Sequence, residues 1–250
     1  MKPALLIAAL CALAVTPVAH AQTTTTAPAA ATPSVGTLMM GCTQTADRAA
    51  AIAACTGLIK AAGKDTATLS TAYMARAAAA KGNGDLKGAF NDLSSALYAD
   101  PKNAGIWLKR GDIRAALGQK IRSAADYSIA LKYDPKNINA LLGRGEQYRL
   151  LGVLPKAIED ATAAIKLDPK SAAAFANRAY ASQRYGKNDD AIKDADEAIK
   201  LDTKSAIAYA ARGLARTATD KIAAITDLKR ALELDPKLAA ATDALKKLVN

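Results

Sequence analysis

The chain has 250 residues, of which 51% are hydrophobic, and a formal net charge of +11 at neutral pH. This length predicts one or two domains. Nucleic acid is not the expected partner, because the aromatic residues make up only 4% of the chain and are not interleaved with the basic residues as base-stacking platforms are. Enzymatic activity is not expected either, since the only histidine lies in a segment that we expect to be removed, and no glycine-rich phosphate-binding loop follows a strand.

The N-terminal segment 1–21 follows the pattern of a secretory signal peptide. Lys2 precedes an apolar run over residues 4–18, and the Ala-His-Ala sequence at 19–21 fits the cleavage pattern that would leave Gln22 as the new N-terminus. The apolar run is too short to remain as a membrane-spanning helix. We therefore expect a periplasmic protein, or alternatively a secreted one, whose mature chain lacks His20 and carries a net charge of +10 after the loss of Lys2.

Two further segments precede the repeats described below. Residues 22–41 are expected to form a flexible linker, because residues 22 to about 37 are rich in Thr, Ala and Pro and lack the large apolar side chains that build a core. Residues 42–69 are expected to form an N-terminal cap. Cleavage removes Cys11 and leaves Cys42 and Cys55, and an even pair in an oxidising compartment predicts a disulfide, with two buried free thiols as the alternative. No metal site or cofactor is expected, because no histidine or further cysteine remains.

The spacing of the two cysteines constrains the fold of the cap. In one continuous helix their Cα atoms would lie roughly 20 Å apart, whereas a disulfide needs a separation below about 7 Å. The chain must therefore turn back after Cys42, around residues 43–45, and we expect a helix to begin near Asp47.

One unit recurs five times after the cap. Its end is marked by an aspartate followed by proline or threonine, and the steps between successive marks are 34, 34, 34 and 33 residues. The marks are Asp100-Pro101, Asp134-Pro135, Asp168-Pro169, Asp202-Thr203 and Asp235-Pro236. A fixed period in this range predicts a solenoid of stacked helical hairpins, which offers a surface to partners. The units fall at about 70–103, 104–137, 138–171, 172–205 and 206–238, and residues 239–250 are expected to form a C-terminal capping helix.

The third unit illustrates why each repeat is expected to be a hairpin. A first helix is predicted over residues 138–151, and Gly152 then marks a turn. Pro155 suits the first turn of a second helix, whose apolar residues recur at spacings of three and four. Asp168-Pro169 ends this helix, because proline cannot continue it. The turn glycine recurs as Gly84, Gly118, Gly152 and Gly186.

This pattern resembles the tetratricopeptide repeat (TPR) family, whose signature reads Trp-x2-Leu-Gly-x2-Tyr, later Ala-x3-Phe, then Pro. Trp107 and Gly111 match it in the second unit and Tyr148 in the third. The resemblance implies an all-α, right-handed superhelical solenoid of five helix-turn-helix repeats with helical caps, of the kind found in exported bacterial TPR proteins. The fifth unit departs from the pattern, since it lacks the turn glycine, and its turn around residues 217–221 is expected to be built differently.

Arginine replaces the family's leucine before glycine in every unit, and an aspartate follows it at a spacing that is constant in four units and one position shorter in the fifth. We predict one structural ion pair per hairpin. The predicted pairs are Arg76–Asp92, Arg110–Asp126, Arg144–Asp160, Arg178–Asp194 and Arg212–Asp227. A ladder of arginines that binds an anionic partner is the alternative.

A second charged series follows the proline position of each unit and consists of Lys102, Lys136, Lys170, Lys204 and Lys237. Such a basic edge could attract an anionic component of the cell envelope. The simpler interpretation is a solvated loop near helix C-termini, where positive charge is favourable in any case.

The resemblance also implies a groove lined by the first helix of each unit. Its expected lining residues are Met74, Lys81, Leu108, Asp112, Leu142, Glu146, Arg149, Tyr180, Gln183, Arg184 and Leu214. We therefore expect a non-enzymatic scaffold or adaptor that binds a peptide or partner protein, with no small-molecule substrate. The alternative is an electrostatic binder of anionic envelope polymer or lipid through the basic edge between repeats. A solvated groove, with partners meeting another face, also remains open.

Overall fold

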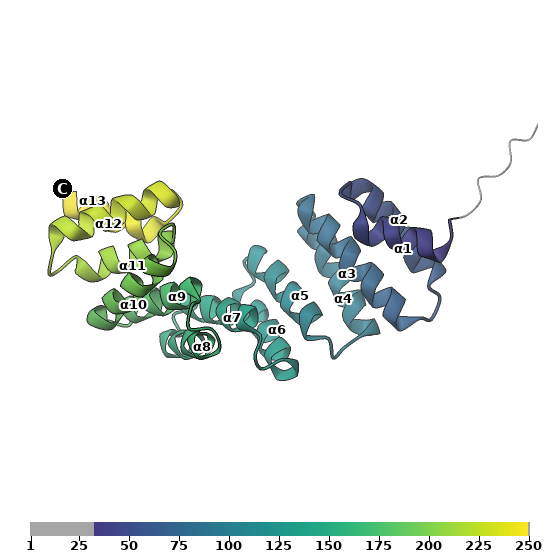
Figure 1. Cartoon of the computed structure of the whole chain (residues 1–250), viewed down its shortest axis with the longest axis horizontal. Helices are drawn as coiled ribbons and strands as arrows, with labels where there is room; N and C mark the ends of the chain where they lie inside the picture. Colours follow the sequence, from purple (N-terminus) through teal and green to yellow (C-terminus); the bar gives the residue numbers. More distant parts are fainter. Residues whose placement is uncertain (1–32, 250) are drawn as a thin grey trace, which may run out of the picture. The chain divides into compact units, whose positions relative to one another are not determined.

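The computed structural model describes residues 33–249, in which thirteen α-helices follow one another and no strand occurs (Figure 1). The helices are α1 (Val35–Gln44), α2 (Arg48–Ala61), α3 (Thr66–Gly82), α4 (Leu86–Ala99), α5 (Ala104–Ala116), α6 (Lys120–Tyr133), α7 (Ile138–Leu150), α8 (Leu154–Leu167), α9 (Ala172–Arg184), α10 (Asn188–Leu201), α11 (Ala206–Arg216), α12 (Lys221–Leu234) and α13 (Ala239–Val249). The expected signal peptide and the first part of the expected linker lie outside the described residues. None of the described helices combines the length and the apolar character needed to cross a membrane.

The helices pack in consecutive pairs, and each pair packs on the next. Four pairs, from α5 with α6 to α11 with α12, lie within the units expected from the sequence. The first pair, α3 with α4, begins at Thr66, in the segment expected to be the cap, and α13 covers the last pair. The prediction of an all-α repeat solenoid is thereby confirmed.

Glycine forms the turn inside four of the hairpins. Gly84, Gly118, Gly152 and Gly186 have φ angles of 81°, 72°, 78° and 88°, in the left-handed region that a side chain disfavours. The fifth hairpin lacks this device. There Thr217 ends α11 in a right-handed conformation, and the Asp220 side chain caps α12 by accepting a hydrogen bond from the backbone N–H of Ala223. The turn of the fifth unit is thus built differently, as its sequence predicts.

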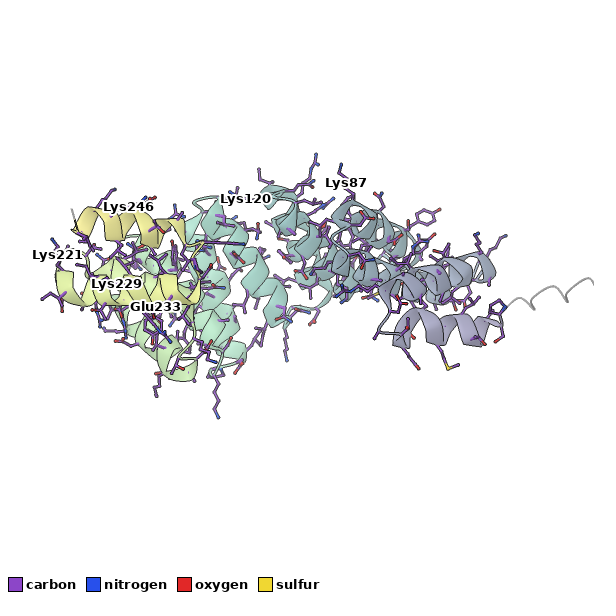
Figure 2. All side chains as sticks on the ribbon, turned by 90° about the horizontal axis from the view of Figure 1, so that it is seen from above. Lys87, Lys120, Lys221, Lys229, Glu233 and Lys246 are labelled. Atoms are coloured by element: carbon purple, nitrogen blue, oxygen red, sulfur yellow. A yellow bond between two sulfur atoms is a disulfide. The ribbon has the colours of Figure 1, made fainter. Side chains whose placement is uncertain are left out.

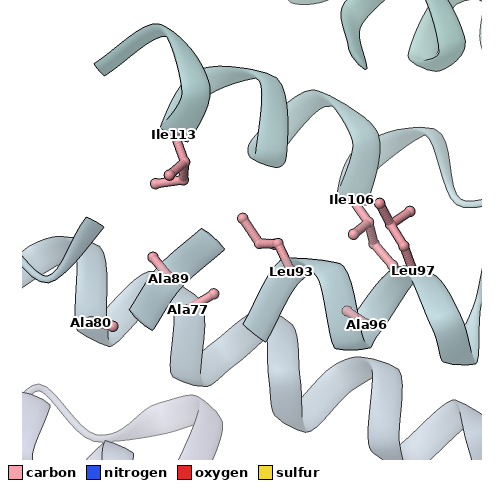
Figure 3. Close-up of a cluster of buried hydrophobic side chains, with 8 residues drawn as sticks. All are labelled: Ala77, Ala80, Ala89, Leu93, Ala96, Leu97, Ile106 and Ile113. Carbon is pink, nitrogen blue, oxygen red and sulfur yellow. The ribbon is translucent and has the colours of Figure 1, made fainter. Parts of the chain in front are cut away.

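Small side chains allow the helices to approach closely. The alanine five residues before each proline position is fully buried in every repeat, at Ala96, Ala130, Ala164, Ala198 and Ala231. Larger residues fill the space between hairpins, and Figure 3 shows Leu93 and Leu97 of α4 facing Ile106 and Ile113 of α5. The core is therefore a series of small clusters, each shared by neighbouring helices.

The N-terminal cap differs from the sequence expectation. Residues 35–41 are not a linker but most of helix α1, which begins after Ser34, whose side chain accepts a hydrogen bond from the backbone N–H of Thr37. Leu38 and Met39 pack against the buried cluster around the cysteines. The linker prediction extended too far, because the low-complexity stretch ends before Leu38 and Met39, whose burial stabilises this helix.

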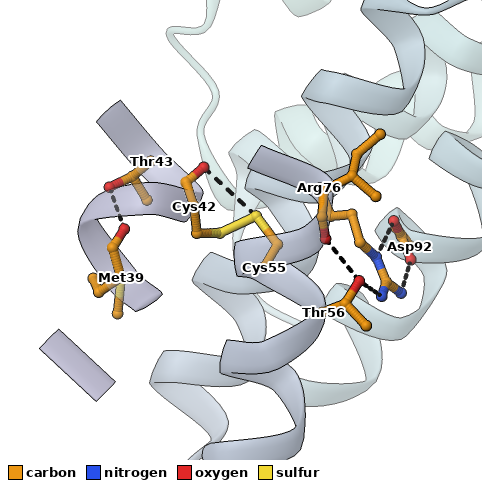
Figure 4. Close-up of a disulfide and its surroundings, with 8 residues drawn as sticks. Met39, Cys42, Thr43, Cys55, Thr56, Arg76 and Asp92 are labelled. Atoms are coloured by element: carbon orange, nitrogen blue, oxygen red, sulfur yellow. Dashed lines mark hydrogen bonds and ion pairs between the residues drawn. A yellow bond between two sulfur atoms is a disulfide. The ribbon is translucent and has the colours of Figure 1, made fainter. Parts of the chain in front are cut away.

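The cysteines of the cap form a disulfide (Figure 4). Cys42 lies near the end of α1 and Cys55 in the middle of α2, with their Cα atoms 4.6 Å apart. The chain turns back over residues 45–47, and α2 begins at Arg48 with Asp47 as its N-cap, close to the expected position. The disulfide thus holds α1 onto the rest of the cap.

Candidate functional site

The structure brings the members of all five predicted Arg–Asp pairs together. In each hairpin the guanidinium Nε and Nη2 donate to the two carboxylate oxygens of the aspartate, which is the bidentate geometry that arginine favours. The Nη2–Oδ1 distances are 2.7 Å for Arg76–Asp92, 2.8 Å for Arg110–Asp126, 2.7 Å for Arg144–Asp160, 2.7 Å for Arg178–Asp194 and 2.6 Å for Arg212–Asp227. The aspartate side chains are only 1–12% exposed.

Each arginine also reaches back to the preceding hairpin, which the sequence-based prediction missed. Its Nη1 donates to a hydroxyl there in four cases, and to a carboxylate in the fifth. These acceptors are Thr56, Ser94, Ser128, Thr162 and Asp196, at 3.1, 3.5, 3.2, 3.3 and 2.6 Å. Figure 4 shows the first example, with Arg76 between Asp92 and Thr56. The last four recur at the 34-residue period, which is the signal that could have identified them.

These contacts use all three nitrogens of each guanidinium, with one hydrogen bond from each. Hydrogen bonding to Asp160 raises the pKa of Arg144, and Asp194 raises that of Arg178 in the same way. Two hairpins contain an additional arginine on the same aspartate, Arg114 on Asp126 and Arg216 on Asp227. The geometry supports a structural role for the arginine series, which joins each hairpin internally and to its predecessor.

A wide hollow on the described surface lies between the cap and the first two repeats. It has a volume of about 640 Å³ and is lined by the end of α1 with the turn that follows it, by α2 and α3, and by Lys109 of α5. A smaller adjoining hollow lies between α3, α4 and α5 and shares Met74, Ala78 and Lys109 with the first. Three residues of the predicted groove, Met74, Lys81 and Asp112, line one or both of these hollows.

The two hollows have a cationic border and a floor of small apolar residues. Arg48, Lys81 and Lys109 line them, while Ala75 and Ala78 lie beside Met74 on α3. The one acidic lining residue, Asp112, accepts a hydrogen bond of 2.8 Å from the hydroxyl of Tyr127. This region can therefore accommodate an extended segment that carries negative charge beside small apolar side chains.

Tyr127 contacts this region through its hydrogen bond to Asp112, which lines the smaller hollow. Its ring occupies the space left by Gly111 and Gly143, where an added Cβ would lie 2.8 and 2.7 Å from the ring. Burial, followed by the neighbouring Asp112 carboxylate, raises the pKa of Tyr127 well above its ordinary value of 10.0. The sequence-based prediction missed Arg48, Lys109 and Tyr127 as contributors to the site, although Lys109 directly follows the predicted groove residue Leu108.

The remaining groove residues do not share this site. Leu108 and Leu142 are half-buried against the cluster around Tyr127, and Leu214 is half-buried in the C-terminal cluster. Gln183 is half-buried and Glu146 is exposed.

Tyr180 contradicts the groove prediction, because it is buried, with only 7% of its surface exposed. The guanidinium of Arg149 lies over its ring at 4.7 Å from the centroid, and Arg184 donates to the backbone oxygen of Arg149 at 3.0 Å. Arg149 also lies 3.7 Å from the carboxylate of Glu146. The long side chain of Arg149 therefore covers the tyrosine that the family resemblance placed in the groove.

The lysine series between repeats is accompanied by negative charge. In four repeats the backbone N–H of the lysine donates to the aspartate two residues earlier. The lysines are Lys136, Lys170, Lys204 and Lys237, at 3.3, 2.9, 2.9 and 3.0 Å. Each lysine thus follows a carboxylate closely along the chain, and the edge presents both charge signs.

Comparison with known proteins agrees with this architecture. No protein-family model matches the sequence, and no curated protein matches it. The structure of MamA protein is similar at 25% identity over 68% of this chain and 94% of that chain, with a TM-score of 0.58. YrrB, described as a TPR protein with an unusual peptide-binding site, shares 18% identity over 77% of this chain and 97% of its own, with a TM-score of 0.60. A tetratricopeptide repeat protein from Parabacteroides merdae shares 22% identity over 81% of this chain and 78% of its own, with a TM-score of 0.57. These similarities, with the phased repeats, show that the chain has the fold of the tetratricopeptide repeat proteins.

Proposed function

We propose that this tetratricopeptide repeat protein is a non-enzymatic scaffold that binds a peptide or partner protein in the hollow between its cap and its first two repeats. The observation that carries the proposal is the 640 Å³ hollow, which is bordered by Arg48 and Lys109 and floored by small residues of α3. The similarity of the fold to YrrB, a TPR protein with a peptide-binding site, supports the same class of function.

The charge of the hollow indicates the kind of segment it accepts. Arg48, Lys81 and Lys109 come from three different helices, and Asp112 is already bonded to Tyr127. An extended peptide with acidic side chains or a free C-terminal carboxylate would place its charge beside these cations. The apolar floor then accepts small aliphatic side chains.

The proposed location is the periplasm. A signal peptide over residues 1–21 would export the chain, and a disulfide persists in an oxidising compartment of this kind. Sequencing the N-terminus of the protein from a periplasmic extract tests the export step. We expect Gln22 as the first residue, and a retained Met1 would contradict it.

Site-specific crosslinking in the native compartment tests the binding site. A photoreactive residue at Met74, in the hollow, is expected to capture a discrete partner, whereas one at Tyr98, which is 94% exposed on α4 outside the hollow, is not. Lys109→Glu should weaken the Met74 crosslink, because it reverses a charge at the border. Identical crosslinks from both positions, or no effect of Lys109→Glu, would contradict the proposal.

The alternative function, binding of anionic envelope polymer or lipid through the lysines between repeats, predicts a different result. That binding would collapse as salt is raised and would be weakened by removal of Lys136 and Lys170 together. The carboxylates that accompany these lysines argue against a strong field at this edge, so the scaffold function is favoured.

A further inference from the structure

Two neighbouring hairpin turns expose aliphatic side chains to solvent. Ile121, at the start of α6, is 73% exposed. Leu150, at the end of α7, and Leu151 and Val153, in the turn that follows, are 38–40% exposed. Leu151 and Ile121 line the same shallow hollow, so the second turn and the third lie side by side. We call the four aliphatic residues and the basic residues beside them (Lys120, Arg122 and Lys156) the turn patch.

Every charged side chain within the two turn segments is basic. Lys120 and Arg122 flank Ile121, and Lys156 follows closely after Val153, all three being exposed. Residues 116–122 and 149–156 contain no acidic side chain. Among the described residues, none of the three basic side chains takes part in an ion pair. The turn patch therefore differs from the edge between repeats, where aspartate accompanies lysine.

We propose that the turn patch attaches the protein to the surface of an anionic phospholipid bilayer. Aliphatic side chains at protruding turns, flanked by lysine and arginine, combine shallow insertion with attraction to acidic headgroups. This inference does not depend on the proposed peptide site, because the turn patch and that hollow have no residue in common.

Two properties of the turn patch favour lipid over a folded acidic protein. Four partly exposed side chains offer much less surface than the roughly 800 Å² per partner that a standard protein interface buries. The hollow between the turns is also open and lined by only six residues, so it provides little of the shape that would select one rigid partner. A bilayer deforms around protruding side chains and needs no such complementarity.

The chain contains a matched control for this surface. Lys221 and Ile222 begin α12 just as Lys120 and Ile121 begin α6, and Ile222 is 81% exposed. The turn before α12 carries threonine and aspartate in place of aliphatic residues. Figure 2 labels Lys120 and Lys221, which lie on separate parts of the ribbon. Substitution at either site alters an exposed residue and leaves the core intact.

The test is sedimentation of the protein, in the form processed by the exporting cell, with vesicles of equal phosphatidylglycerol and phosphatidylcholine or of phosphatidylcholine alone. We expect binding to the anionic vesicles that declines with salt and is absent with phosphatidylcholine. Lys120→Gln should weaken binding about fivefold, the expected effect of one basic residue near an anionic surface. Ile121→Asn should weaken it at least as much, while Lys221→Gln and Ile222→Asn should leave it unchanged.

Three results would overturn the proposal. The first is no binding to anionic vesicles. The second is an equal loss in Ile121→Asn and Ile222→Asn, which would show that membrane contact is not specific to the turn patch. The third is unchanged vesicle binding by Ile121→Asn together with loss of an acidic protein partner, which would assign the turn patch to that protein. A loss of the Met74 crosslink by Lys109→Glu that leaves vesicle binding unchanged would keep the two proposals separate.

Discussion

Replacement of Arg144 by alanine tests how much the repeated arginine contributes to the stability of the fold. The guanidinium donates to both oxygens of Asp160, at 2.9 and 2.7 Å, and to the hydroxyl of Ser128 on the preceding hairpin, at 3.2 Å. The Asp160 side chain is 5% exposed, so Arg144→Ala would leave a buried carboxylate without its partner. The matched control is Lys170→Ala, which also removes a basic side chain but at an exposed loop position. This substitution keeps the hydrogen bond to Asp168, because the donor is the backbone N–H of residue 170.

The magnitude follows from burial. Removing one member of a buried ion pair costs about 3–5 kcal/mol, and the lower end applies here because the Arg144 side chain is 23% exposed and its outer edge is hydrated. A loss of about 3 kcal/mol lowers the melting temperature of a domain of this size by about 6–12 °C. Lys170→Ala should shift it by less than about 2 °C, as is usual for an exposed residue.

The assay is thermal unfolding followed by circular dichroism at 222 nm, with the double variant Arg144→Ala/Asp160→Ala included. Removing both partners eliminates the stranded charge, so the double variant should be more stable than Arg144→Ala by about 2 kcal/mol. Equal melting temperatures for Arg144→Ala and Lys170→Ala, or a double variant less stable than Arg144→Ala, would refute the reasoning.

Three other predictions concern the cap, a turn and the support of the hollow. Cys55→Ser should destabilise the cap by about 3 kcal/mol and release α1 while the repeats stay folded. Amide hydrogen exchange should then become faster in residues 35–44 alone, and a uniform acceleration over all repeats would contradict this prediction. Gly152→Ala should lower the free energy of unfolding, measured with urea, by about 1 kcal/mol, because φ is 78° there. Gly36→Ala, at an exposed position of α1, should not destabilise the protein. Tyr127 has a raised pKa, so its contribution to stability is complete below pH 10 and is lost as pH rises through the folded value. Tyr127→Phe should therefore be less stable than the wild type at pH 8 by about 1 kcal/mol and show a smaller loss of stability from pH 8 to pH 11; parallel losses would show that Tyr127 ionises normally.

Much of the fold could be predicted because the repeats are local in sequence. The 34-residue period fixes where each hairpin ends, and Gly84, Gly118, Gly152 and Gly186 fix where each turns, since these positions need φ angles that other residues disfavour. The Arg–Asp pairs were also within reach of the sequence, because their regular separation along the chain places one member on each helix of a hairpin. Helix α1 was not predictable in this way, since it lies outside the repeats and is held by the disulfide and by packing on α2 and α3.

The candidate site depended far more on tertiary contacts. The family resemblance placed Tyr180 in the groove, but Arg149 from the preceding repeat covers it. Arg48 of the cap and Lys109 of the second repeat are distant in sequence and meet at one hollow only because the cap and the first two repeats stack. A spacing rule within one repeat cannot anticipate such contacts, because they depend on how neighbouring hairpins pack.

The sequence alone determined the repeat, its class of fold and the ion pair inside each hairpin, because these follow from helical periodicity and from residues a fixed distance apart. The tertiary structure decided three other features: the second bond of each arginine to the preceding hairpin, the cationic hollow beside the disulfide-bonded cap, and the pairing of Ile121 with Leu151 at adjacent turns. Each of these arises between hairpins, where the distance between two side chains is set by packing and not by their separation along the chain.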